Sequence, residues 1–153
     1  MAISLTSTGL SGEIRNTTQP AFCVKKDNDQ GSPATGATVT WSSERFDQGS
    51  DFTSNTFTAP VTGRYFLIVY YRLDGHDQNS YGYMHINTSN INYEMHLHST
   101  NEWDASASYY PMHGHALADM DASDTAYVQW HFNAGNAPSN ISPDGYFSGF
   151  LVC

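Results

Sequence analysis

The chain has 153 residues, which is the length of one domain and enough to bury a hydrophobic core without disulfide or metal support. Its formal net charge of −9, with only six Lys and Arg, argues against binding to nucleic acid or to anionic membrane surfaces, because both need clustered cations. Ten Tyr, eight Phe and three Trp, set among many Ser, Thr, Asn and Gly, favour β-strands joined by turns.

Residues 1–19 are small and polar and show no hydrophobic period, which predicts an N-terminal arm that is extended or partly disordered in the isolated protein. The opening residues lack the basic and long apolar regions of a secretory signal, and no stretch has the length of a transmembrane span. We therefore expect a soluble protein made in a cytoplasm, or a mature form whose signal has been removed. Residues 20–153 form the predicted globular domain.

Strands are predicted at residues 20–24, 37–41 and 44–49, and the chain then reaches the stretch that organises the fold, residues 55–74. Pro60 and Gly63 bracket a turn there, because Pro fixes φ and Gly tolerates positive φ. Residues 64–73 follow as a long strand rich in aromatic and β-branched side chains. Their nearly continuous apolar run predicts a central strand that is covered on both faces.

The second half of the chain continues the strand pattern. Residues 81–86 and 91–97 predict a hairpin, in which Tyr93, Met95 and Leu97 share one face and His96 and His98 the other. Further strands are predicted at residues 109–120, 125–132 and 146–152, with a tight turn at 121–124. Eight to ten short strands without a helical period indicate an all-β sandwich or barrel.

The two cysteines stand near opposite ends of the chain and have no metal-type spacing. Cys23 lies in an apolar run, which is typical of a buried free thiol. A bond between Cys23 and Cys153 stays open as an alternative, because the termini of a sandwich can be neighbours.

Five stretches, in order along the chain, resemble the globular head domain of complement C1q, part of the tumour-necrosis-factor-like jelly-roll superfamily. They are Pro20-Ala-Phe22; Phe46-Asp47 with Gly49; Phe57-Thr-Ala-Pro-Val-Thr-Gly-Arg-Tyr-Phe66, which is close to the signature Phe-x-x-Pro-x-x-Gly-x-Tyr-x-Phe; residues 117–128, with Ser123-Asp124 where the family has Gly-Asp; and Tyr146-Phe-Ser-Gly-Phe-Leu-Val152. The resemblance implies a two-sheet antiparallel jelly-roll sandwich of about ten strands, a compact homotrimer, and both termini at one end.

The chain differs from the best-known members of that family because no collagen-like Gly-X-Y stretch precedes the domain. The lead-in, residues 12–22, resembles the segment before such domains on phage structural proteins. The resemblance therefore favours a virion protein, such as a capsid decoration protein or a fibre knob, over a complement-type or hormone-type protein.

Two groups of side chains could hold a divalent metal. His96 and His98 at i, i+2, and His113 and His115 likewise, could meet their copies on a three-fold axis and bind a transition metal such as zinc, nickel or iron. The alternative is that these rows face solvent or a polar interface. Asp121 and Asp124 could contribute to a calcium site, but Asp is also common in turns for its turn geometry, and we expect Asp124 to cap its own turn. No cofactor is required by these patterns.

Aromatic residues supply the remaining candidates. Trp103, His76, Tyr109 and Tyr110 could form a surface that binds a glycan or a protein partner, because Tyr and Trp bring amphipathic contact area. We expect Tyr83 to pack in the core or at the trimer contact instead. The same assignment applies to a larger set of aromatic residues: Phe57, Tyr65, Phe66, Phe147 and Phe150.

An enzyme is not expected, because the sequence has no nucleophile elbow, phosphate-binding loop, HExxH motif or dinucleotide fingerprint. The preferred hypothesis is a homotrimeric virion structural protein that attaches to capsid or tail proteins through the arm at residues 1–19. The alternative is a recognition module, either on a phage or secreted, whose loops bind a host glycan or receptor. The first hypothesis places affinity in the arm, and the second places it in the loops near Trp103, His76 and Asn136.

Overall fold

The computed structural model describes residues 18–76, 81–99, 107–133 and 140–153, and in these segments the chain is built of β-strands. No helix long and apolar enough to cross a membrane occurs in this part of the chain. The strands are β1 (Ala21–Lys25), β2 (Gln30–Gly31), β3 (Ala37–Thr38), β4 (Ser43–Gln48), β5 (Phe52–Thr53), β6 (Thr56–Thr58), β7 (Gly63–His76), β8 (Tyr81–Thr88), β9 (Asn92–Ser99), β10 (Ala107–Met120), β11 (Thr125–Phe132), β12 (Asn140–Ile141) and β13 (Tyr146–Leu151).

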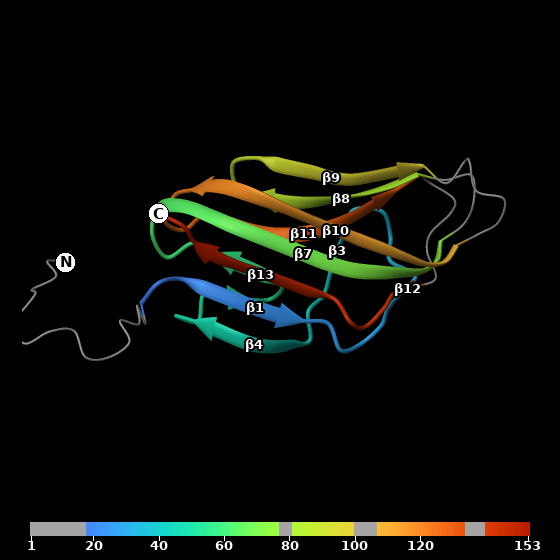
Figure 1. Cartoon of the computed structure of the whole chain (residues 1–153), viewed down its shortest axis with the longest axis horizontal. Helices are drawn as coiled ribbons and strands as arrows, with labels where there is room; N and C mark the ends of the chain where they lie inside the picture. Colours follow the sequence, from blue (N-terminus) through green and yellow to red (C-terminus); the bar gives the residue numbers. More distant parts are fainter. Residues whose placement is uncertain (1–17, 77–80, 100–106, 134–139) are drawn as a thin grey trace, which may run out of the picture.

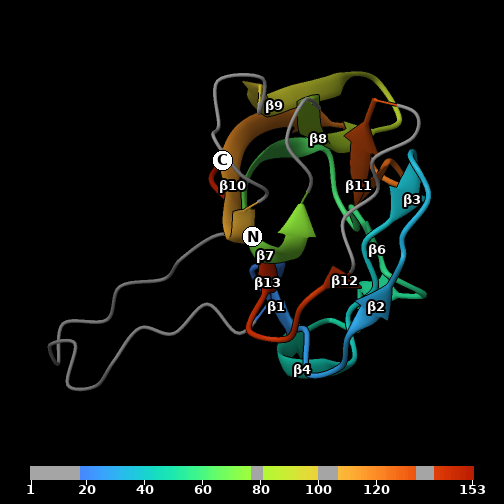
Figure 2. The ribbon, with the colours of Figure 1, turned by 90° about the vertical axis from the view of Figure 1, so that its right-hand side faces the viewer.

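The strands form two antiparallel sheets that face each other (Figures 1 and 2). The first sheet has the order β2-β12-β7-β13-β1-β4, and β10 pairs with the other edge of β7. The second sheet has the order β5-β6-β11-β8-β9, with β3 paired to β11. The predicted all-β jelly-roll sandwich is confirmed. The described residues form thirteen strands, four of which have only two residues, where about ten strands were expected.

The long strand β7 lies inside the first sheet, with β10 on one side and β12 and β13 on the other. Its alternate side chains, Tyr65, Leu67, Val69, Tyr71 and Leu73, are 0–1% exposed and face the second sheet. The intervening side chains Phe66, Ile68 and Tyr70 are only half-buried. One face of β7 is therefore covered by the second sheet, whereas the described residues do not supply the predicted cover on the other face.

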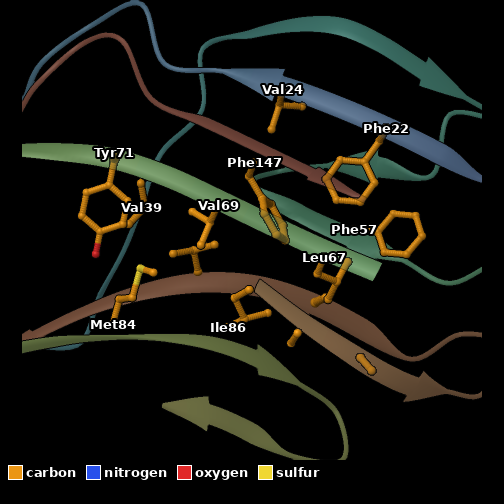
Figure 3. Close-up of a cluster of buried hydrophobic side chains, with 14 of the residues drawn as sticks. Phe22, Val24, Val39, Phe57, Leu67, Val69, Tyr71, Met84, Ile86 and Phe147 are labelled. Carbon is orange, nitrogen blue, oxygen red and sulfur yellow. The ribbon is translucent and has the colours of Figure 1, made fainter. Parts of the chain in front are cut away.

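The core between the sheets is rich in aromatic rings (Figure 3). The ring of Phe22 lies 4.6 Å from that of Phe57 and 5.0 Å from that of Phe147, measured between centroids. Phe57, Tyr65 and Phe147 are 0% exposed, so their predicted packing role is confirmed as a core role. Burying side chains of this size supplies the main stabilisation of a sandwich without a disulfide.

The family-like motifs have local structural reasons. Both carboxylate oxygens of Asp47 accept backbone hydrogen bonds, from the N–H groups of Asp51 and Phe52, and Gly49 supplies the positive φ of +110° that this turn needs. The hydroxyl of Tyr65 donates to the carbonyl oxygen of Val61 at 2.7 Å and so fixes the turn before β7. These residues stabilise turns rather than perform chemistry.

The two described ends of the domain are neighbours, as the resemblance implied. The backbone N–H of Leu151 donates to the carbonyl oxygen of Pro20, and the amide of Gln19 donates to the carbonyl oxygen of Leu151 at 2.6 Å. Residues 1–17 of the predicted arm lie outside the described residues, whereas Gln19 already contacts the domain.

Strand β9 contains a bulge that changes which side chains face the core. Gly82 pairs with His98 but Met84 pairs with Met95, so residues 95–98 of β9 lie opposite residues 82–84 of β8. His96, within this bulge, has a positive φ of +53°. As a result Leu97 is 63% exposed and His98 is 8% exposed. The predicted faces of these two residues are therefore wrong, because strict alternation does not survive a one-residue insertion.

Candidate functional site

The outer face of the first sheet carries an uncovered row of apolar side chains. The strand register places Leu117 of β10 beside Phe66 of β7, and Phe66 beside Phe150 of β13. The rings of Phe66 and Phe150 meet edge to face at a centroid distance of 5.9 Å. Leu117 is 55% and Phe150 42% exposed, so this row faces outward and not into the core.

The adjacent rows of the same face continue the apolar character. Ile68 lies between His115 and Ser148 in the ladder, and the next row brings the rings of Tyr70 and Tyr146 together at 5.9 Å. We define the apolar face by the side chains of these rows: Phe66, Ile68, Tyr70, His115, Leu117, Tyr146 and Phe150. A contiguous apolar surface of this kind is typical of a protein contact, because soluble monomers seldom leave one uncovered. The predicted packing role of Phe66 and Phe150 thus falls on a surface and not in the core.

The predicted metal-binding histidines are only partly brought together. The rings of His96 and His113 lie 4.6 Å apart, whereas His98 stacks on Tyr110 at 4.1 Å and is buried beside Trp130. His115 lies on the apolar face, 5.7 Å from the ring of Phe66. No group of three or more His, Cys, Asp or Glu side chains suited to a metal occurs in the described segments. A site shared between copies therefore stays a prediction.

The contact between His96 and His113 joins β9 of the second sheet to β10 of the first sheet at one side of the sandwich. Strand β10 ends the first sheet, so its outer backbone groups lack a strand partner. The Nδ1 atom of His96 lies 3.3 Å from the carbonyl oxygen and 3.5 Å from the amide nitrogen of His113. The bulge in β9 thus directs an imidazole to the free edge of β10. Burial, and next the nearby His113, lower the pKa of His96.

Acid should weaken this contact, because a lowered pKa means that the folded protein resists protonation of His96. Just below pH 6.5 the unfolded chain then binds more protons than the folded chain, so stability falls as the pH falls through this value. We expect a His96→Asn variant, whose side chain tolerates positive φ, to lose less stability between about pH 7 and about pH 5 than the wild type. Urea unfolding at each pH measures this. Part of the fall should remain, because burial also lowers the pKa of His131. Equal pH dependence in both proteins would contradict the assignment.

The aspartates at the 121–124 turn serve its geometry. A carboxylate oxygen of Asp124 accepts hydrogen bonds from the backbone N–H of Asp121 at 2.8 Å and from the amide of Asn90 at 2.7 Å. This is the capping role that was expected of Asp124. The carboxylate of Asp121 accepts from the hydroxyl of Thr62 at 3.3 Å.

Of the predicted ligand-binding residues, the described part of the chain shows the side chains of Tyr109 and Tyr110, and the fold separates these two. Tyr109 is 67% exposed, and the guanidinium of Arg72 lies 4.5 Å from its ring centre. Tyr110 instead packs against His98 and the core. Trp103 and Asn136 lie outside the described residues. His76 closes β7 opposite Ala107, and its side chain is likewise outside the description.

Two further predictions concern Tyr83 and the cysteines. Tyr83 lies on the outer face of the second sheet, where its ring stacks on His131 at 4.9 Å. It is therefore not in the core, and the other expected role, at the trimer contact, stays a prediction. Cys23 and Cys153 are both free thiols, so the alternative of a bond between them is not realised.

Sequence reasoning also missed a groove of about 450 Å³ beside β4. It lies between that strand and the β5–β6 hairpin, and its lining includes Trp41, Glu44, Thr53 and Asn55. These residues come from segments that carry no recognisable motif. Only the aromatic Trp41 at the end of a predicted strand gave a signal, and its neighbours depend on long-range packing.

The described residues form a two-sheet antiparallel β-sandwich with an exposed apolar face. A model of the C1q domain family matches residues 21–152, and the chain therefore belongs to the C1q domain family. Domains of this family are recognition or structural modules rather than enzymes, and they typically self-associate as trimers.

Among solved structures, the chain is similar to the globular domain of zebrafish complement 1qA protein. The two share 18% sequence identity with a TM-score of 0.67, and the match covers 88% of this chain and 98% of that one. At this identity the similarity shows the fold alone. A comparison with curated protein sequences gave no significant match.

Proposed function

We propose that the chain is a non-enzymatic, homotrimeric structural protein of a virus particle, and that the apolar face holds the trimer together. The apolar face is the observation that carries the proposal. Its central side chains Phe66, Ile68 and Tyr70 are half-buried within one chain, and a neighbouring copy would complete their burial. Membership of a family of trimeric modules supports three copies over two.

The role in a virion rests on the lead-in to the domain. Residues 12–22 resemble the segment before such domains on phage structural proteins, and the described chain enters the domain beside its C-terminal strand. Three arms of a trimer would then leave from one end of each domain. The arm at residues 1–19 would then bind a capsid or tail protein.

Mass measurement under native conditions tests the trimer directly. We expect a single species of three times the 16.9 kDa of one chain. The same mass should persist after chelation, because apolar contacts rather than a metal would hold the subunits. Loss of the trimer with chelator would instead favour a metal shared by three copies, because His113 and His115 of β10 both lie on the face where copies would meet. A monomer in dilute solution would contradict the proposal itself.

Removing residues 1–17 should abolish attachment to the particle and leave the trimer intact, because the described domain begins after them. Co-sedimentation of the purified protein with particles that lack it measures attachment, and native mass measurement on the same sample controls for assembly. Unchanged attachment of the truncated trimer would place the affinity in the domain instead.

The second candidate function is a recognition module that is carried on a phage or secreted. It is favoured by Tyr109, whose ring is exposed and held over the guanidinium of Arg72. Exposed aromatic rings of this kind are common in binding surfaces for proteins and glycans.

A further inference from the structure

The groove beside β4 joins an apolar floor to a polar rim. Strand β4 ends the first sheet and β5 ends the second. The groove lies beside these two edge strands, and its lining includes residues of both. Val24 and Phe52 are buried beneath it. Trp41 is partly exposed, and its ring is held by a stacked contact with Phe147 at 6.0 Å.

The rim carries donors and acceptors that the described chain does not use. The side-chain oxygen of Asn55 accepts a hydrogen bond from the backbone N–H of Trp41 at 2.7 Å, which leaves the amide nitrogen of Asn55 as a donor. Neither the hydroxyl of Thr53 nor the carboxylate of Glu44 has a side-chain partner among the described residues. The β5–β6 turn that bears Asn55 is tight, with φ of +50° at Ser54 and +66° at Asn55, so the amide of Asn55 has a fixed position.

We propose that this groove binds one residue of a neutral sugar. Its volume of about 450 Å³ falls in the range of small-molecule sites, and the combination of an aromatic floor with a few polar groups matches a ring that has apolar C–H faces and hydroxyl edges. The carboxylate of Glu44 accepts from sugar hydroxyls, and the amide of Asn55 donates to them. No Lys, Arg or His lines the groove among the described residues, and the chain carries a net charge of −9, so anionic ligands are disfavoured.

This inference does not depend on the trimer, because the groove is formed within one chain. It gives the second candidate function a location that differs from the loops and from Tyr109. A shallow site with few hydrogen bonds binds weakly, but three linked copies would strengthen attachment to a surface that repeats the same sugar.

Ligand-observed NMR tests the site, with the methyl glycosides of glucose, galactose, mannose and N-acetylglucosamine as separate probes and sialic acid as the anionic comparator. We expect at least one neutral sugar to bind and to shift the indole N–H signal of Trp41, assigned with a Trp41→Phe variant. Thr53→Val and Glu44→Gln should each weaken binding about three- to tenfold, the value of one hydrogen bond. Asn55→Asp should act similarly, because Asp keeps the acceptor for Trp41 but loses the donor.

The matched control is Glu94→Gln, which makes the same chemical change on β9. Strands β9 and β5 are at opposite edges of the second sheet, so this variant should bind the sugar as tightly as the wild type does. Native mass and thermal midpoint are recorded for every variant, so that loss of fold is separated from loss of binding. The inference is overturned if no neutral sugar binds to the folded protein, if the groove variants bind as the wild type does, or if sialic acid binds more tightly. A trimer that does not bind sugar would contradict the sugar site but not the proposed function. A monomer that binds sugar would contradict the proposed trimer but not the sugar site.

Discussion

A Leu117→Glu variant should be a folded monomer. Leu117 is 55% exposed in the single chain, so glutamate there is solvated and changes the stability of the isolated domain by less than about 0.5 kcal/mol. In a trimer the same carboxylate would be buried against the apolar face without a partner, at a cost of several kcal/mol for each copy. Sedimentation or native mass measurement should therefore show one chain instead of three, with an unchanged circular dichroism spectrum.

The control is Ile91→Glu, which makes the same replacement at a residue of equal exposure, 54%, at the turn before β9 and away from the apolar face. This variant should remain a trimer. If both variants stay trimeric, the apolar face is not the contact. If both dissociate, the general charge of the chain rather than this face controls association.

Phe147→Ala should lower the free energy of unfolding by about 3–5 kcal/mol, which is typical of removing a fully buried aromatic ring. Phe147 is 0% exposed and contacts the rings of Phe22, Trp41 and Phe52. Urea unfolding in the Leu117→Glu background measures the effect, because unfolding there is not coupled to dissociation.

Phe150→Ala is the matched comparison in the same monomeric background, since Phe150 comes from the same strand but faces outward. We expect it to cost less than half as much as Phe147→Ala. Equal losses would mean that the assignment of the two faces of β13 is wrong.

Much of the sandwich was predictable because local patterns dominate its longest strands. The aromatic and β-branched run after Gly63 identified β7 as the central strand, and turn residues separated it from its neighbours. The same run also predicted a cover on both faces, whereas the described residues leave Phe66 and Ile68 half-buried and so supply only one cover. The sequence indicated that β7 needs a second cover, but it does not identify the molecule that provides it.

The faces of β9 could not be predicted, because nothing in its sequence marks the bulge. A bulge is commonly signalled by Gly at positive φ, whereas here His96 takes that conformation. The reason is tertiary, since its ring contacts the backbone of His113 on another strand. The groove could not be predicted for a similar reason. Trp41 and Asn55 are 14 residues apart, and a hydrogen bond from the backbone N–H of Trp41 to the side-chain oxygen of Asn55 brings them together.

The place of β13 in the first sheet has a consequence for how the protein is made. The last strand of the chain lies between β7 and the first strand, β1, and β1 carries β4 at its other edge. The ribosome synthesises β13 after every other strand of the domain, so β1 and β4 cannot join β7 until β13 has been made. Contacts that join such distant parts of a chain form slowly. The first sheet should therefore be completed only after all strands of the domain have been synthesised, and trimer assembly would follow that step.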